Sequence, residues 1–174
     1  MSGKWRHFCM EGQRAFSLIE ILLVLTLVMI IGVIAAPGLQ NLLERNQQHT
    51  LYRQVLRTLQ LARSHAIIQG VSVEVCASND GLICSSNWPS GWLIREVDSL
   101  KLITFIQPNH NPHLYWRGFQ TRIVFHSNGT SPLSNGRFFS CSQQLISWQI
   151  ILNRQGRLRT ASSHENSLSK HDCN

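Results

Sequence analysis

Three arginines near the C-terminal end are the residues best suited to bind a ligand. The stretch 153–160 reads NRQGRLRT and holds Arg154, Arg157 and Arg159 without any acid. In an extended chain, residues two apart project to the same side, so Arg157 and Arg159 would lie about 6–7 Å apart. That distance is near the spacing of successive phosphates on one DNA strand, and guanidinium groups bind phosphate in bidentate fashion. The stretch is therefore a candidate phosphate site; a solvated basic strand end without a ligand is the competing interpretation.

The charge of the whole chain agrees with an anionic partner. Its 174 residues include 16 Lys+Arg against 9 Asp+Glu, a formal net charge of +7. Such a balance favours nucleic acid or acidic lipid without choosing between them. Contacts to a nucleic-acid backbone would carry no sequence preference. The Ser- and His-containing stretch after Thr160 is expected to be flexible and to let this edge adapt to DNA.

The cysteines indicate disulfides in an oxidising compartment. The chain has five cysteines, an odd number that becomes four if an N-terminal segment with Cys9 is removed. No pair has the C-x2-C spacing of a zinc site. We expect a bridge from Cys76 to Cys84 across a turn-rich loop and another from Cys141 to Cys173. Pairing of Cys76 with Cys141 or Cys173 remains open, as do free thiols.

The sequence shows no constellation for catalysis. It has no nucleophile motif, no Gly-rich phosphate loop and no calcium loop. Glu96 and Asp98 fall in a strand-to-turn region and do not form an acid/base pair. His110 and His113 lie in a Pro- and Asn-rich loop and form no convincing metal site. We expect neither enzymatic activity nor a cofactor or metal.

An apolar segment near the N-terminus indicates membrane insertion. A basic stretch, Met1–Ala15, precedes an apolar run from Phe16 to Pro37 whose single charge is Glu20. At about 1.5 Å per residue, 16–36 spans about 30 Å, the thickness of a hydrocarbon core. The basic flank places Met1–Ala15 in the cytoplasm and the chain after Pro37 across the membrane.

Glu20 is the unusual residue of this run. A carboxylate inside an apolar span costs about 2.5–3.5 kcal/mol, so it needs a partner that its own helix does not supply. An ordinary secretory signal, with its small residues at Ala35 and Ala36, is the alternative for this segment. The apolar run is too long for that interpretation.

The segment Ala15-Phe16-Ser17-Leu18-Ile19-Glu20 resembles the type IV prepilin cleavage motif. The resemblance implies that a prepilin peptidase cuts between Ala15 and Phe16 and that Phe16 is then N-methylated. It also implies that Glu20, as fifth residue of the mature chain, pairs with the α-amino group of a neighbouring pilin. The family usually has Gly before the cut, so Ala15 is a departure that would slow cleavage.

A helical pattern continues beyond the apolar run. Apolar residues recur every three or four positions, at Leu51, Val55, Leu59, Ala62 and Ala66. The opposite face carries Arg45, Arg53, Arg57 and Arg63. The pattern predicts a helix over 16–69, about 80 Å long, with a kink or loosening at Pro37-Gly38 and a stop at Gly70. Its apolar half, 16–37, would face lipid or sister helices, and its amphipathic half, 38–69, would pack on a head formed by 70–174.

The head has the pattern of an antiparallel sheet. Val71, Val73 and Val75 alternate with polar residues, and short apolar runs separated by Asn, Gly and Pro follow. The predicted strands are Gly91–Val97, Lys101–Ile106, Thr121–His126, Gly136–Cys141 and Ser147–Leu152. A sheet on a long helix makes the fold class α+β.

The order of short motifs in the head resembles the GspH/FimT group of minor pilins and pseudopilins. These motifs are Val75-Cys76, Asp80-Gly81, Cys84, Trp88-x-x-Gly91-Trp92, Phe125-x-x-x-Gly129 and Ile150-Ile151-Leu152 running into Gly156-Arg157. The resemblance implies a type IV pilin-like fold. Gly156-Arg157-Leu158-Arg159 is similar to the C-terminal DNA-binding motif of the FimT branch, whose members help to take up DNA in natural transformation. It implies a DNA-binding set of Arg154, Gly156, Arg157 and Arg159.

Together these features predict a minor type IV pilin, held in the inner membrane by a single span with its head in the periplasm. It would join the filament with other pilins and bind double-stranded DNA through the arginine tail. The alternative is a structural minor pilin or type II secretion pseudopilin that primes assembly without DNA. A tethered periplasmic enzyme is disfavoured because no catalytic site is evident. If the tail does not bind DNA, Arg45, Arg53 and Arg57 are the next candidates.

Overall fold

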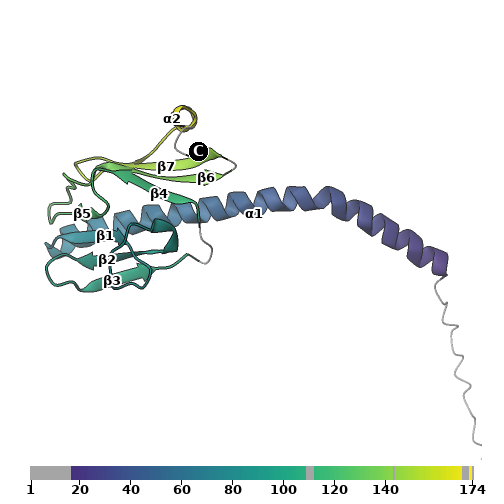
Figure 1. The fold of residues 1–174 in the computed structure, drawn as a ribbon, viewed down its shortest axis with the longest axis horizontal. Coiled ribbons are helices and arrows are strands. Elements are labelled where there is room, and N and C mark those ends of the chain that lie inside the picture. The colour runs from purple at the N-terminus through teal and green to yellow at the C-terminus, as the bar shows by residue number, and fades with distance from the viewer. Residues whose placement is uncertain (1–16, 109–111, 143, 170–172, 174) are drawn as a thin grey trace, which may run out of the picture. The chain divides into compact units, whose positions relative to one another are not determined.

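The computed structural model describes residues 17–108, 112–142, 144–169 and 173 (Figure 1). It comprises two compact units, Met1–Glu44 and Arg45–Asn174, and the helix α1 (Leu18–Gln69) belongs to both. Each unit is described by itself.

The first unit consists of the apolar part of α1. The large apolar side chains described between Leu18 and Leu43 are each more than half exposed. Among the described residues, α1 is the one helix long and apolar enough to cross a membrane, by length and composition. The helix continues through Pro37 and Gly38, so this pair does not end it. A proline removes one helical hydrogen bond, a loss that apolar helices tolerate.

The second unit begins with the amphipathic part of α1. The predicted apolar stripe, Leu51, Val55, Leu59, Ala62 and Ala66, is buried, with exposed fractions of 6% or less. The helix ends at Gln69 as predicted. Gly70 follows with φ +68°, a left-handed conformation that glycine adopts without steric cost and that commonly terminates helices.

Two four-stranded sheets pack on this part of α1. Sheet A has the order β3 (Leu102–Ile106), β2 (Trp92–Glu96), β1 (Val73–Ala77), β5 (Ile123–Phe125). Sheet B has the order β4 (Leu114–Gly118), β6 (Gly136–Ser142), β7 (Leu145–Leu152), β8 (Leu158–Thr160). All pairs of neighbouring strands are antiparallel, as predicted. A short 3-10 helix, η1 (Trp88–Ser90), precedes β2.

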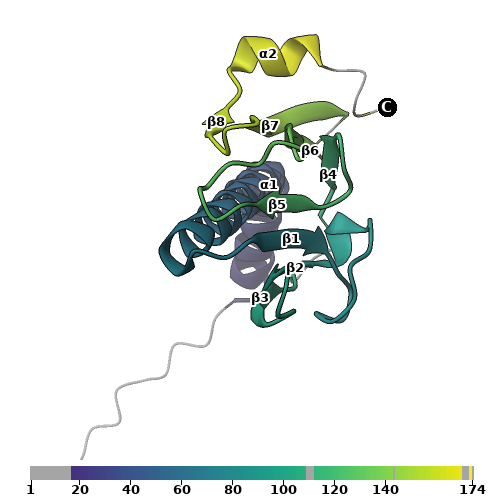
Figure 2. The same ribbon diagram turned by 90° about the vertical axis from the view of Figure 1, so that its left-hand side faces the viewer.

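The sequence-based prediction missed three elements. The strands β4 and β8 were not foreseen, and the strands form two sheets where one was expected. The stretch after Thr160 was expected to be flexible, but it contains the helix α2 (Ser163–Leu168). Figures 1 and 2 show α2 beyond β7, on the side of sheet B away from α1.

One core joins α1 to the inner faces of both sheets. Its strand residues include Val73, Val75, Trp92, Ile94, Phe125, Phe138, Ile150 and Leu152. Fully burying side chains of this kind stabilises the fold by roughly 1.5–3 kcal/mol each. The indole N–H of Trp92 donates to the hydroxyl of Thr58 on α1 at 3.0 Å, so this buried donor is satisfied.

Candidate functional site

The arginines singled out from the sequence stand on a β-hairpin formed by β7 and β8. In its turn the N–H of Gly156 donates to the carbonyl of Asn153 at 3.0 Å, and the N–H of Asn153 donates to the carbonyl of Arg157 at 3.1 Å. The side-chain oxygen of Asn153 accepts from the N–H of Arg157 at 2.9 Å. Gly156 has φ +72°, the left-handed conformation that such a turn requires. The arginines therefore have a defined backbone and are not on a free tail.

A second turn packs against this hairpin. The N–H of Gly129 donates to the carbonyl of His126 at 2.7 Å, and Gly129 has φ +75°. The N–H of Ser131 donates to the carbonyl of Arg154 at 2.9 Å and links the two turns. Two glycines that the sequence placed in separate motifs, Gly129 and Gly156, thus belong to one junction.

Arg63 of α1 completes the junction. Its Nε–H donates to the carbonyl of Gly129 at 3.1 Å, and its Nη2–H donates to the carbonyl of Gln155 at 3.4 Å. The expectation that Arg63 lies on the outer face of the helix is therefore wrong, because it is half-buried under the two turns. Arg53 and Arg57 are exposed, as predicted. The hairpin that carries the candidate site is thus held directly by α1.

Arg154 and Arg157 are exposed on this hairpin. For neither side chain does the described part of the chain provide a hydrogen bond or ion pair. Both guanidinium groups are therefore available to a ligand.

Arg159 is different, because it already holds a carboxylate. Its Nη1 and Nη2 donate to the two carboxylate oxygens of Glu165 at 3.0 and 2.8 Å. The bidentate bond from Arg159, and then the backbone N–H of Ser162, lower the pKa of Glu165 to about 2. The stretch 153–160 itself contains no acid, as the sequence indicated. In the folded chain, however, α2 brings the carboxylate of Glu165 into contact with Arg159, so the arginine cluster is not free of acids.

Glu165 reaches this place through a capping box at the start of α2. The hydroxyl of Ser162 accepts from the N–H of Glu165, and the Glu165 carboxylate accepts from the N–H of Ser162. The pattern Ser162-x-x-Glu165 is the sequence signature of such a cap and was a signal for a helix here.

Further arginines share the outer face of sheet B with Arg159. The strand register places Arg117 opposite Arg137, Arg137 opposite Ile151, and Ile151 opposite Arg159. Residues directly opposite in neighbouring strands point to the same face. This row was missed from the sequence because it depends on strand register. Arg137 Nη1 donates to the side chains of Gln149 at 3.3 Å and Ser169 at 3.2 Å.

A groove of about 500 Å³ lies between the start of β6 and the β7–β8 turn. Its polar lining residues are Asn135, Arg137, Asn153, Arg154 and Gln155. The sequence between residues 99 and 169, which also includes Arg122 paired with Glu74 on sheet A, is strongly basic. Residues 99–169 contain one acid, Glu165, against seven bases, Lys101 and six arginines. This part of the head suits a polyanion.

Both predicted disulfides are present. Cys76 is bonded to Cys84 and Cys141 to Cys173, with Cα–Cα distances of 5.5 and 5.8 Å. The alternative pairings of Cys76 and the possibility of free thiols at these positions are therefore excluded. Cys9 lies outside the described residues.

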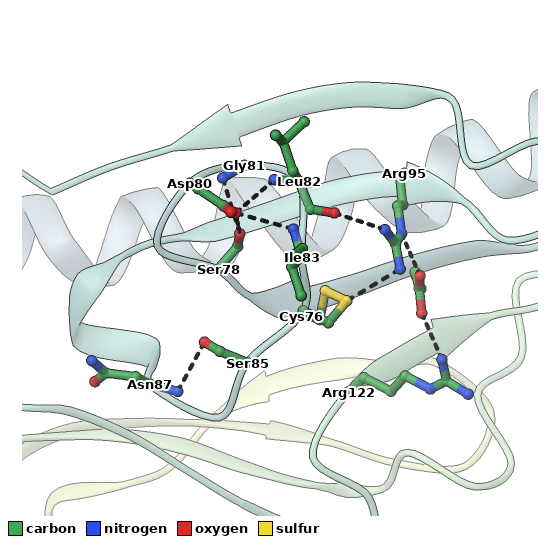
Figure 3. The surroundings of a disulfide bond; sticks show 12 residues. Cys76, Ser78, Asp80, Gly81, Leu82, Ile83, Ser85, Asn87, Arg95 and Arg122 are labelled. Carbon is green, nitrogen blue, oxygen red and sulfur yellow. Dashed lines mark hydrogen bonds and ion pairs between the residues drawn. A yellow bond between two sulfur atoms is a disulfide. The ribbon is translucent and has the colours of Figure 1, made fainter.

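The loop closed by Cys76–Cys84 is held by a polar network on sheet A (Figure 3). The Asp80 carboxylate accepts from the N–H groups of Leu82 and Ile83 at 2.9 and 3.0 Å, and these bonds lower the pKa of Asp80. Arg95 donates to the carbonyl of Leu82 at 3.1 Å and to the buried carboxylate of Glu74.

Arg122 donates to the other oxygen of the Glu74 carboxylate at 3.2 Å. Glu74 is therefore a structural acid shared by Arg95 and Arg122. The described residues contain no group of three His, Cys, Asp or Glu side chains that could hold a metal ion.

The residues predicted for processing and assembly lie at the start of the chain. Ala15 and Phe16 fall outside the described residues. Glu20 lies in the first turn of α1 and is exposed, on the apolar helix where the sequence placed it.

Comparison with known proteins identifies the family. Residues 52–156 match the profile described as "Type II transport protein GspH". A crystal structure of the type IV minor pilin FimU from Pseudomonas aeruginosa is similar, with 21% sequence identity over 70% of this chain and 92% of that chain and a TM-score of 0.53. A second crystal form of FimU gives 20% identity, 67% and 94% coverage and a TM-score of 0.50. No curated protein sequence matches.

The likeness to FimU shows the type IV pilin fold, a long N-terminal helix with antiparallel sheets, as predicted. The profile match runs from the buried part of α1 through both sheets to the β7–β8 turn and covers more than half of the chain. This chain belongs to the GspH family of type IV minor pilins and pseudopilins.

Proposed function

We propose that this protein is a minor type IV pilin that binds double-stranded DNA without sequence preference and so supports DNA uptake in natural transformation. The observation that carries the proposal is the exposure of Arg154 and Arg157 on a hairpin braced by Arg63. Arg117 and Arg137 lie on the same face of sheet B as Arg159, and basic residues grouped in this way would attract a phosphate backbone.

The expected affinity is modest. Two available arginines, or three when Arg159 also takes part, give a log–log salt slope of about −1.8 to −2.7. Non-specific binding of this kind has a Kd on the order of 10⁻⁴–10⁻⁶ M near physiological salt. Several subunits of one filament that engage the same DNA would raise the avidity without further contacts.

Membrane anchoring and assembly follow the prepilin pattern in this proposal. A prepilin peptidase cuts between Ala15 and Phe16, and Phe16 becomes the methylated N-terminus. The exposed apolar part of α1 then spans the inner membrane with the head in the periplasm, and packs on other pilins in the filament. Glu20 pairs with the N-terminal amine of a neighbouring pilin, because a lone carboxylate in an apolar span needs a partner.

A second candidate function is a structural minor pilin or type II secretion pseudopilin that primes assembly and does not touch DNA. The ion pair between Arg159 and Glu165 favours it, because this pair neutralises one of the three arginines. The name of the matching profile, a type II transport protein, also favours it.

A DNA-shift assay on a soluble fragment, residues 40–174, which contains the head and the amphipathic part of α1, separates the two functions. The buried hydrophobic core and both disulfides lie within this segment, so the head keeps the interactions that fold it. The test variant is Arg154→Gln/Arg157→Gln. The matched control is Arg53→Gln/Arg57→Gln, which removes the same charge from two exposed positions of α1.

The variant Arg154→Gln/Arg157→Gln should bind short duplex DNA more weakly, with a salt slope flatter by about 1.8, and the α1 control should bind like wild type. If the control loses binding and the hairpin variant keeps it, the site is on α1 and includes Arg53 or Arg57. A wild-type head that does not bind at low salt would establish the structural pilin function instead.

A further inference from the structure

We infer that the carboxylate of Glu165 competes with DNA phosphate for Arg159. Glu165 binds Arg159 in the absence of DNA and is displaced when a phosphate binds there. The inference rests on the proposed function, because it concerns the same arginine surface. It assigns a role in ligand affinity to Glu165, which no motif in the sequence assigned.

The geometry of the pair supports a competition. Nη1 and Nη2 of Arg159 each donate one N–H to an oxygen of the Glu165 carboxylate, at 3.0 and 2.8 Å, so the end-on pair of donors is occupied. Arginine binds phosphate through the same pair of parallel donors. A phosphate that uses this end-on pair has to displace the carboxylate, and a phosphate at the remaining N–H groups of Arg159 is repelled by the carboxylate next to it.

The exchange requires little disruption of the fold. No residue of α2 is buried, and Leu168 is 69% exposed. Two further hydrogen bonds join this segment to sheet B: Gln149 donates to Asn166 at 3.0 Å, and Arg137 donates to Ser169 at 3.2 Å. The side chains of Arg159 and Glu165 are 58% and 39% exposed. Exposed ion pairs shift an equilibrium by roughly fivefold at most, so a polyanion can displace this one.

Sequence composition points to the same residue. Glu165 is the sole acid in residues 99–171, where bases predominate. Among the described residues of this segment, the Glu165 carboxylate is thus the one negative side chain.

The test measures binding of the full chain in detergent to a short, labelled DNA duplex. In the variant Glu165→Gln the charge that holds Arg159 is lost, but glutamine also closes a capping box, so α2 is retained. The matched control is Asp98→Asn, which removes one negative charge from an exposed position next to β2. Both changes are also made in an Arg159→Gln background.

We expect Glu165→Gln to bind DNA about two- to fivefold more tightly than wild type, with a salt slope steeper by about 0.9. Asp98→Asn should bind like wild type, and Glu165→Gln should have no effect when Arg159 is absent. Binding by Glu165→Gln alone, without binding by wild type, would also support the inference.

Three results would overturn it: equal binding by wild type and Glu165→Gln, an equal gain with Asp98→Asn, or a gain that persists without Arg159. Each of these leaves DNA binding by the head intact. Failure of the proposed function has a different signature, in which neither wild type nor Glu165→Gln binds DNA at low salt.

Discussion

Gly156 lies directly against the backbone of Gly129. A Cβ atom at position 156 would stand 2.1 Å from the carbonyl oxygen of Gly129, far inside van der Waals contact. That same oxygen accepts from Arg63, so three segments distant in sequence meet at one point. The position of the arginine hairpin therefore depends on a glycine that the sequence had suggested as part of the DNA-binding motif.

The contact predicts that Gly156→Ala destabilises the head strongly. Two effects would destabilise the alanine variant: the left-handed conformation costs about 1–2 kcal/mol, and the Cβ atom would collide with the backbone of Gly129. The matched control is Gly70→Ala, where φ is +68° but no atom lies within 4 Å of the added Cβ. Thermal unfolding should show a small loss for Gly70→Ala and a clearly larger one for Gly156→Ala. Equal losses would mean that the two turns separate without cost.

The network on sheet A predicts unequal effects at its two arginines. Glu74 is 2% exposed, Arg95 is 18% exposed and Arg122 is 56% exposed. Glu74→Ala leaves the mostly buried Arg95 without its carboxylate and should cost about 3–5 kcal/mol in the free energy of unfolding. Arg122→Ala should cost at most about 1 kcal/mol, because its side chain is mostly in water. Denaturant titration measures both, and a large loss for Arg122→Ala would contradict this assignment.

The ion pair at Arg159 predicts how the docking of α2 depends on pH. Binding to Arg159 lowers the pKa of Glu165 from 4.5 to about 2. Because the pKa of Glu165 is lower in the folded form, the ion pair contributes its full stability above about pH 4.5. This contribution is lost as the pH falls through 2. An NMR titration of the Glu165 carboxyl group should have its midpoint clearly below pH 4.5, and Arg159→Gln should move the midpoint upwards. A wild-type midpoint near 4.5 would show that the pair does not form in solution.

The lone carboxylate of the apolar helix predicts a defect in assembly and not in insertion. Glu20→Ala removes a charge that costs about 2.5–3.5 kcal/mol in a membrane, so the variant should insert at least as well as wild type. It should enter the filament poorly, because the proposed partner of the N-terminal amine is missing. Membrane fractionation and immunoblots of sheared filaments measure the two steps. Normal incorporation of Glu20→Ala into the filament would contradict the proposed pairing of Glu20 with the N-terminal amine of a neighbouring pilin.

Local patterns in the sequence were sufficient for much of this fold. The apolar stripe from Leu51 to Ala66 predicted the buried face of α1, and Gly70 predicted its end. Six of the strands and both disulfides were also predicted. Each of these strands, and the disulfide between Cys76 and Cys84, depends on residues that are close in sequence. The disulfide between Cys141 and Cys173 was predicted on the assumption that the C-terminal residues return to a strand. The division into two sheets depends on which strands pair, and no local pattern specifies that.

The candidate site shows the same limit. Arg154, Arg157 and Arg159 were found because they are close together in the chain. The pairing of Arg159 with Glu165 requires that α2 folds back, and the row of Arg117, Arg137 and Arg159 requires the register of four strands. Arg63 was misplaced because helical periodicity does not reveal a loop that covers the opposite face.

The disulfide between Cys141 and Cys173 has a consequence for α2. The short helix follows β8 directly, and the bond ties the chain beyond it to β6, so both of its ends are covalently anchored to sheet B. A carboxylate tethered in this way has an effective concentration in the millimolar range, which dilution of the protein does not change. Glu165 therefore acts on Arg159 with a strength that does not depend on the protein concentration.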